Sequence, residues 1–120
     1  MSDWFKAIDA NRLNAGEMKE VLLQGQEILL VRTGEGYYAV ANRCPHMGGR
    51  LSQGKLTGNI VTCPRHSSQF DVTSGNVIRW LKGKGFMSTL GKALKSPRPV
   101  RTYPVKVEGG KVMIQISDEG

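Results

Sequence analysis

The sequence has little cysteine and little histidine, with two of each among 120 residues. All four fall in two short segments, so a site built on these side chains must lie there. No apolar run approaches the about 18 residues that a membrane-spanning helix needs. Residues 1–6 also lack the basic start and apolar core of a signal peptide. We therefore expect a cytoplasmic protein with reduced thiols.

The two segments have similar shapes and are separated by sixteen residues between His46 and Cys63. Two thiolates and two imidazoles make up a complete four-ligand set for a metal. We therefore predict that the metal ligands are Cys44, His46, Cys63 and His66. The two segments read Cys44-Pro45-His46 and Cys63-Pro64-Arg65-His66.

Other interpretations of these residues remain open at this point. The cysteines and histidines could be ordinary buried and surface residues with no metal. A disulfide between Cys44 and Cys63 would leave both histidines unexplained and is rare in a reducing cytoplasm. Zinc also takes two cysteines and two histidines, but zinc fingers usually pair Cys with Cys and His with His. One Cys and one His in each segment better suits two irons, one binding both thiolates and the other both imidazoles.

The extended pattern resembles the Rieske [2Fe–2S] motif, C-x-H followed by a spacer and C-x-x-H. Asn42 and Arg43 resemble the lead-in to the first segment, and Leu51 and Gly54 stand where the family has small turns. Residues 70–75 resemble its F-D-x-x-x-G tail. The resemblance covers about residues 3–80 and 100–116. It implies one Rieske-type [2Fe–2S] cluster per chain, in which Cys44 and Cys63 hold the inner iron and His46 and His66 the outer iron, near the surface.

The resemblance also implies a function in electron transfer rather than in catalysis. It indicates a one-electron carrier between a reductase and a terminal oxygenase or another redox enzyme. The alternative is a permanent small iron–sulfur subunit of a reductase complex, like the small subunit of nitrite reductase. A self-sufficient Rieske oxygenase is excluded, because no histidine remains for its mononuclear iron.

One position departs from the pattern of high-potential Rieske proteins, in which a Ser and a Tyr hydroxyl donate hydrogen bonds to sulfur atoms. By resemblance Ser68 occupies the Ser position, but Phe70 stands at the Tyr position. We therefore expect a reduction potential in the lower half of the range of about −150 to +300 mV. In addition, Ser67 stands where the family usually has glycine.

The pattern predicts one all-β domain over residues 1–120, a small antiparallel sandwich or barrel. Short apolar runs at 21–23, 28–31 and 37–40 are separated by the turns Gln24-Gly25 and Gly34-Glu35-Gly36. Alternating apolar residues on both sides of Gly109-Gly110 predict a hairpin, and Trp4, Phe5 and Ile8 predict a first strand. The metal ligands would lie on loops of a cluster-binding subdomain at about 43–71.

A basic insert occupies about residues 79–101, where the family has only a short link. It contains seven Lys or Arg and no Asp or Glu, so it holds the whole net charge of +7. Apolar residues between Phe86 and Leu94 fall on one face of a helical wheel, which predicts a short amphipathic helix. Such a segment could dock on an acidic redox partner, lie on an anionic membrane, or be solvated surface. Nucleic acid is not expected, because only Trp80 could stack on a base.

Overall fold

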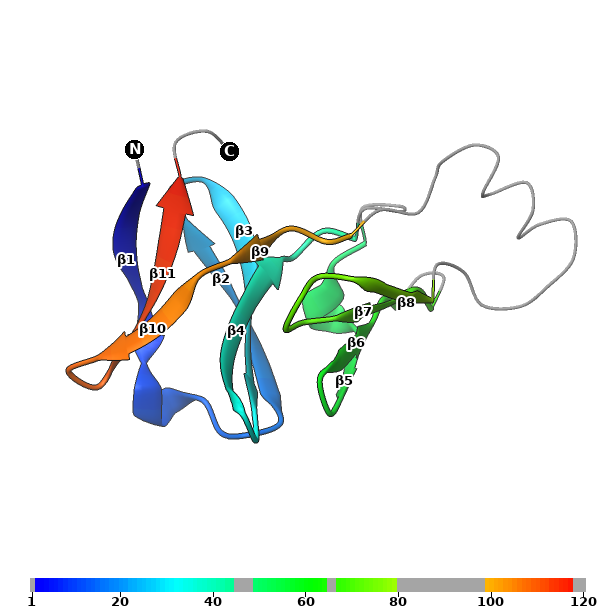
Figure 1. Cartoon of the computed structure of the whole chain (residues 1–120), viewed down its shortest axis with the longest axis horizontal. Coiled ribbons are helices and arrows are strands. Elements are labelled where there is room, and N and C mark those ends of the chain that lie inside the picture. Colours follow the sequence, from blue (N-terminus) through cyan, green and yellow to red (C-terminus); the bar gives the residue numbers. More distant parts are fainter. Residues whose placement is uncertain (1, 45–48, 65–66, 80–98, 118–120) are drawn as a thin grey trace, which may run out of the picture.

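The computed structural model describes residues 2–44, 49–64, 67–79 and 99–117. Within these ranges the chain forms three antiparallel sheets and two single-turn 3-10 helices, η1 (Ala10–Arg12) and η2 (Leu51–Gln53) (Figure 1). The predicted all-β antiparallel fold is confirmed. The helix predicted between Phe86 and Leu94 lies outside the described residues. No helix in the described part of the chain is both long enough and apolar enough to span a membrane.

The described strands divide into three sheets, and the third consists of strands that are consecutive in the chain. The first sheet has the order β1-β11-β10, the second β2-β3-β4-β9 and the third β5-β6-β7-β8. The first contains β1 (Ser2–Asp9), β10 (Val105–Glu108) and β11 (Lys111–Ser117). The second contains β2 (Glu17–Leu23), β3 (Gln26–Thr33), β4 (Gly36–Ala41) and β9 (Thr102–Tyr103). The third contains β5 (Lys55–Thr57), β6 (Ile60–Thr62), β7 (Gln69–Asp71) and β8 (Val77–Arg79).

Both predicted two-residue hairpin turns are present and have the expected backbone geometry. Gln24 and Gly25 connect β2 to β3 with φ angles of 51° and 76°. Gly109 and Gly110 connect β10 to β11 with φ angles of 59° and 77°. Two successive positive φ angles define the type I′ turn, whose twist matches that of the flanking strands. These turns fix the register of the hairpins that they close.

The strand β3 of the middle sheet is buried on both faces and contributes to two separate hydrophobic cores. Successive side chains of a strand point to opposite faces. Ile28 and Leu30 therefore pack into what we call the base core, toward the first sheet, while Leu29 and Val31 pack into the loop core, toward the third sheet. All four are fully buried. This explains why residues 28–31 form a continuous apolar run instead of alternating with polar residues.

The first and last strands pair along their whole length and close the base of the molecule. The pairing of β1 with β11 runs from Ser2 opposite Ser117 to Asp9 opposite Lys111. A register irregularity between Lys6 and Ile8 interrupts it. Figure 1 shows these two strands side by side at the end of the molecule farther from the third sheet.

Candidate metal centre

The structure buries both predicted cysteine ligands in the loop core. Cys44 lies three residues beyond the end of β4, and Cys63 follows directly on β6. Their exposed fractions are 2% and 1%, and no disulfide joins them. The other two predicted ligands, His46 and His66, lie outside the described residues. Of the four, the structure therefore brings the two cysteines into one apolar core.

Two loops of equal length carry these cysteines, and they are closed in the same way. We call residues 44–49 the first cysteine loop and residues 63–68 the second cysteine loop. The Cys44 N–H donates to the Gly49 carbonyl over 2.8 Å, and the Cys63 N–H donates to the Ser68 carbonyl over 2.7 Å. In both loops the acceptor lies five positions after the cysteine. The two segments thus have different Cys-to-His spacings, yet they lie on loops of matching length.

The strands beside the loops match as well. Arg43 and Arg50 form an isolated antiparallel bridge beside the first loop, and Thr62 pairs with Gln69 beside the second. Each loop therefore begins and ends beside an antiparallel backbone pair. Such a pair, which we call the stem of the loop, fixes both ends of the loop and places its side chains reproducibly.

The donor set fits an iron–sulfur cluster. A thiol buried in apolar surroundings resists ionisation, whereas a bound metal ion neutralises the thiolate and makes it stable there. Two buried thiols without a disulfide, at equivalent positions of two loops, are the soft ligands that an iron–sulfur centre requires. In the part of the chain that the structure describes, no group of three or more His, Cys, Asp or Glu residues forms a different metal site.

Asn42 holds the stem of the first cysteine loop against η2. Its side chain is fully buried. The Asn42 Oδ1 accepts from the Ser52 N–H over 2.8 Å, and its Nδ2 donates to the Ser52 Oγ over 3.2 Å. The Leu51 N–H also donates to the Asn42 carbonyl over 2.9 Å. The sequence indicated Asn42 only as part of the motif, while the structure shows that this residue joins two segments.

An ion pair fixes the same stem from outside. Arg43 donates from Nε to Glu27 Oε2 over 2.9 Å and from a second guanidinium nitrogen to Oε1 over 3.1 Å. The hydrogen bond from Arg43 lowers the pKa of Glu27, burial opposes this, and the charges of Arg43 and Arg50 lower it further. The same hydrogen bond raises the pKa of Arg43. Because both side chains are partly exposed, solvent weakens the attraction between them.

Ser67 in the second cysteine loop has a positive φ of 60°. This is the left-handed region, which glycine adopts freely and other residues enter only at a cost. The conformation explains why a glycine is usual at this position. The Ser67 N–H donates to the Cys63 carbonyl over 3.1 Å, and Arg79 Nε donates to the Ser67 carbonyl over 3.2 Å. The sequence signalled Ser67 only by the departure from glycine, and gave no signal for Arg79.

The motif residues that follow the second cysteine loop stabilise its base. Phe70 is fully buried in the loop core. The Asp71 Oδ1 accepts from the Thr73 N–H over 2.8 Å and so fixes a tight turn. Gly75 has a φ of 80°, and its carbonyl accepts from the Val100 N–H over 2.9 Å. These contacts tie the end of the third sheet to the chain that returns to β9.

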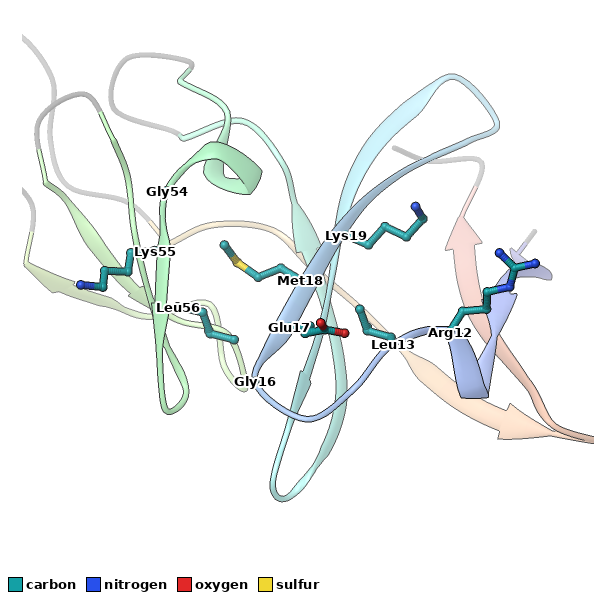
Figure 2. Close-up of a pocket in the computed structure, with 9 residues that line it drawn as sticks. All are labelled: Arg12, Leu13, Gly16, Glu17, Met18, Lys19, Gly54, Lys55 and Leu56. Carbon is teal, nitrogen blue, oxygen red and sulfur yellow. The ribbon is translucent and has the colours of Figure 1, made fainter.

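An open hollow of about 470 Å³ lies between β2 and β5 (Figure 2). Its charged lining residues are Arg12, Glu17, Lys19 and Lys55. Figure 2 shows Lys55 and Arg12 pointing away from each other rather than toward a common point. Because the charged groups do not converge, we assign no ligand to this hollow.

Comparison with known proteins decides the family. The model of the Rieske [2Fe–2S] domain matches residues 3–104. The chain belongs to the Rieske [2Fe–2S] family. It therefore carries a Rieske-type [2Fe–2S] cluster and acts as an electron-transfer protein rather than as an enzyme.

Relatives in sequence and in structure include ferredoxins of dioxygenase systems. The ferredoxin component of the naphthalene 1,2-dioxygenase system of Pseudomonas aeruginosa is 33% identical over 116 residues, which cover 95% of this chain and 96% of that protein. The structure of the ferredoxin of carbazole 1,9a-dioxygenase from Nocardioides aromaticivorans IC177 superposes with a TM-score of 0.76 at 26% identity, covering 92% of this chain and 95% of that one. A structure described as an NADH-dependent nitrite reductase small subunit from Mycobacterium tuberculosis shares the fold. It superposes with a TM-score of 0.75 at 22% identity, and the match covers 98% of this chain and 97% of that one.

Proposed function

We propose that this Rieske protein is a mobile one-electron carrier between a reductase and a terminal oxygenase. The observation that carries the proposal is the pair of matched cysteine loops with both thiols buried in one core. Similarity to ferredoxin components of dioxygenase systems over nearly the whole chain supports the choice of partners. We place the protein in the cytoplasm, where such partners and reduced thiols are found together.

Four residues of this chain would hold the cluster. Cys44 and Cys63 would bind the inner iron, and His46 and His66 the outer iron. When bound, the cluster supplies reversible one-electron chemistry, at a higher potential than an all-cysteine cluster because two imidazoles replace two thiolates. The chain itself buries the thiols, excludes water from them and fixes the loops.

We propose extending the cluster-binding subdomain, predicted at about 43–71, to Arg79. The third sheet begins at Lys55 and ends with β8, whose last residue is Arg79. Cys44 and Cys63 pack in the loop core together with Val61 and Phe70 of this sheet. We propose a single domain in which residues 43–79 form the cluster-binding part.

Metal analysis and electron paramagnetic resonance test the proposed centre and its ligands. We expect two irons and two acid-labile sulfides per chain, and a Rieske spectrum after reduction. His46→Cys and His66→Cys should each abolish that spectrum, while Thr57→Cys, at an exposed position of β5, should preserve it. One zinc and no labile sulfide in protein made with ample iron and without oxygen would refute the proposal.

The alternative function, a permanent subunit of a reductase complex, is distinguished by assembly. A mobile carrier elutes as a small protein by itself and reduces its acceptor with many turnovers per molecule. A subunit instead co-purifies at a fixed ratio with a larger chain. Recovery only as part of such a complex would replace the carrier by the subunit.

We further propose that the basic insert at 79–101 steers the carrier to an acidic surface of a redox partner. Residues 80–98 lie outside the described residues, so the support comes from their charge. Exposed charges are screened over about 10 Å at 0.1 M salt, and electron transfer should therefore slow as salt rises. Changing Lys82, Lys84, Lys92 and Lys95 to Gln should lower the association rate and flatten the salt dependence.

A matched variant and a membrane assay complete this test. Changing Lys19, Lys55, Lys106 and Lys111 to Gln removes the same charge elsewhere and should leave the salt dependence nearly intact. Binding to anionic vesicles that is lost when Phe86 and Leu90 are made polar would indicate a membrane surface instead. A rate indifferent to salt and to the insert's lysines, without vesicle binding, would leave the insert as solvated surface.

A further inference from the structure

Ser67 needs a partner that holds its backbone. Among the described residues two that are not glycine have a positive φ, Gln24 and Ser67. Gln24 lies in a two-residue hairpin turn, where such an angle is usual. Ser67 instead lies in the second cysteine loop, beside the proposed ligand His66 and before the buried Ser68. Because a side chain disfavours this conformation, surrounding contacts must maintain it.

Arg79 provides such a contact from the neighbouring strand. Its Nε donates to the Ser67 carbonyl over 3.2 Å, across twelve positions of the sequence. The two backbone bonds that close the loop run from Ser67 to Cys63 and from Cys63 to Ser68. Hydrogen bonds from a charged donor are roughly twice as strong as neutral ones. Arg79 thus holds the carbonyl of the strained residue itself.

A β-bulge places Arg79 opposite the end of this loop. Phe70 pairs with Val77, whereas Gln69 pairs with Arg79. One step along β7 thus corresponds to two steps along β8, and Ile78 is the additional residue of the bulge. A bulge bends its strand and changes the direction of the following side chain. Ile78 is half exposed, while the Arg79 guanidinium reaches the loop.

We propose that Arg79 is a positioning residue for the second cysteine loop. It compensates for a serine at the position where a glycine would adopt the left-handed conformation without help. It acts through the Ser67 backbone and thereby sets the placement of Cys63 and His66. The proposal rests on the proposed function, because it takes these two residues as cluster ligands.

Two substitutions separate the hydrogen bond from the charge. Arg79→Lys keeps the positive charge but removes the Nε donor, and Arg79→Gln removes both. We expect both to shift the midpoint potential and the g values of the reduced protein, and to speed loss of labile sulfide by about tenfold. The control Lys55→Gln removes a charge from an exposed position in the same sheet and should leave all three readouts unchanged.

Rescue by glycine is the decisive part of the test. In a Ser67→Gly background the loop no longer needs the contact, so Arg79→Lys should change sulfide loss by at most about twofold. If the Arg79 variants take up no cluster at all, the double variant should restore it. An effect of Arg79→Gln that Arg79→Lys does not share, or one that Ser67→Gly does not relieve, would overturn the positioning role. A wild-type protein without iron and labile sulfide would instead overturn the proposed function itself.

Discussion

Adding a single methyl group at Gly54 should destabilise the protein strongly, because the backbone leaves no room there. A Cβ at Gly54 would lie 1.9 Å from the Thr62 carbonyl oxygen, whereas real Cβ atoms essentially never come closer than 3.0 Å to such an atom. The carbonyl would therefore have to retreat by about 1.1 Å. It cannot do so independently, because Thr62 pairs with Lys55 and directly precedes Cys63.

The size of the effect follows from this geometry. The Leu51 carbonyl oxygen, 3.2 Å away from the same Cβ, prevents the new methyl from tilting aside. Overpacking against fixed groups costs about 3 kcal/mol, a large part of the stability of a small domain. With about 4 °C of melting temperature per kcal/mol at this size, Gly54→Ala should melt about 12 °C below the wild type.

Gly34→Ala is the matched control for this experiment. A Cβ at Gly34 meets nothing within 4 Å, and the residue has no positive φ. Alanine there should be neutral or slightly stabilising, because it restricts the unfolded chain. Thermal melts at one scan rate, followed by circular dichroism and by visible absorption, compare the two variants. A Gly54→Ala protein that melts within about 2 °C of Gly34→Ala would refute the reasoning.

Three further predictions test the core, the stem and the cluster surroundings. Leu29→Ala should lower the free energy of unfolding by about 2–5 kcal/mol in denaturant titrations, because Leu29 is fully buried in the loop core. Leu22→Ala, at a 69% exposed position, should change it by no more than about 0.5 kcal/mol. The lowered pKa of Glu27 means that its pairing with Arg43 stabilises the fold above the ordinary value of 4.5 and is lost as the pH falls through the lowered value. The melting difference between wild type and Glu27→Gln should therefore be largest near neutral pH and disappear in acid, and a constant difference would contradict this. The reduction potential of the wild type should lie in the lower half of the Rieske range. Phe70→Tyr should raise this potential, because the new hydroxyl enters the core that contains both cysteines. If voltammetry gives a wild-type value above about +200 mV, or no rise in the variant, the interpretation of Phe70 is wrong.

Local sequence signals were sufficient to predict the two long hairpins, β2-β3 and β10-β11. Gln24-Gly25 and Gly109-Gly110 combine turn residues with flanking apolar runs, and both turns are where the pattern predicts them. The short strands of the third sheet could not be predicted individually, because three residues carry no measurable alternation. The two-sided burial of β3 is also a tertiary property, although its continuous apolar run is compatible with it.

The candidate site was predictable in composition but not in its supporting contacts. The cysteines were identified from spacing and resemblance, and the structure buries both of them in one core. The contact of Arg79 with Ser67 depends on a bulge in β8, which no sequence pattern reveals. Likewise, the buried hydrogen bonds of Asn42 become visible only when η2 is placed beside it. The histidine ligands remain predictions.

The pairing of β1 with β11 has a consequence for how the chain folds during synthesis. On the ribosome, β1 emerges first, but its partner strand ends at Ser117 and emerges last. Contacts within residues 43–79 are local by comparison and can form early. The cluster-binding part can therefore begin to fold while β1 still lacks its partner β11, and the first sheet is completed after it. A chain whose residues up to 110 have left the ribosome, but whose β11 has not, would thus present the cluster-binding part attached to an open first sheet.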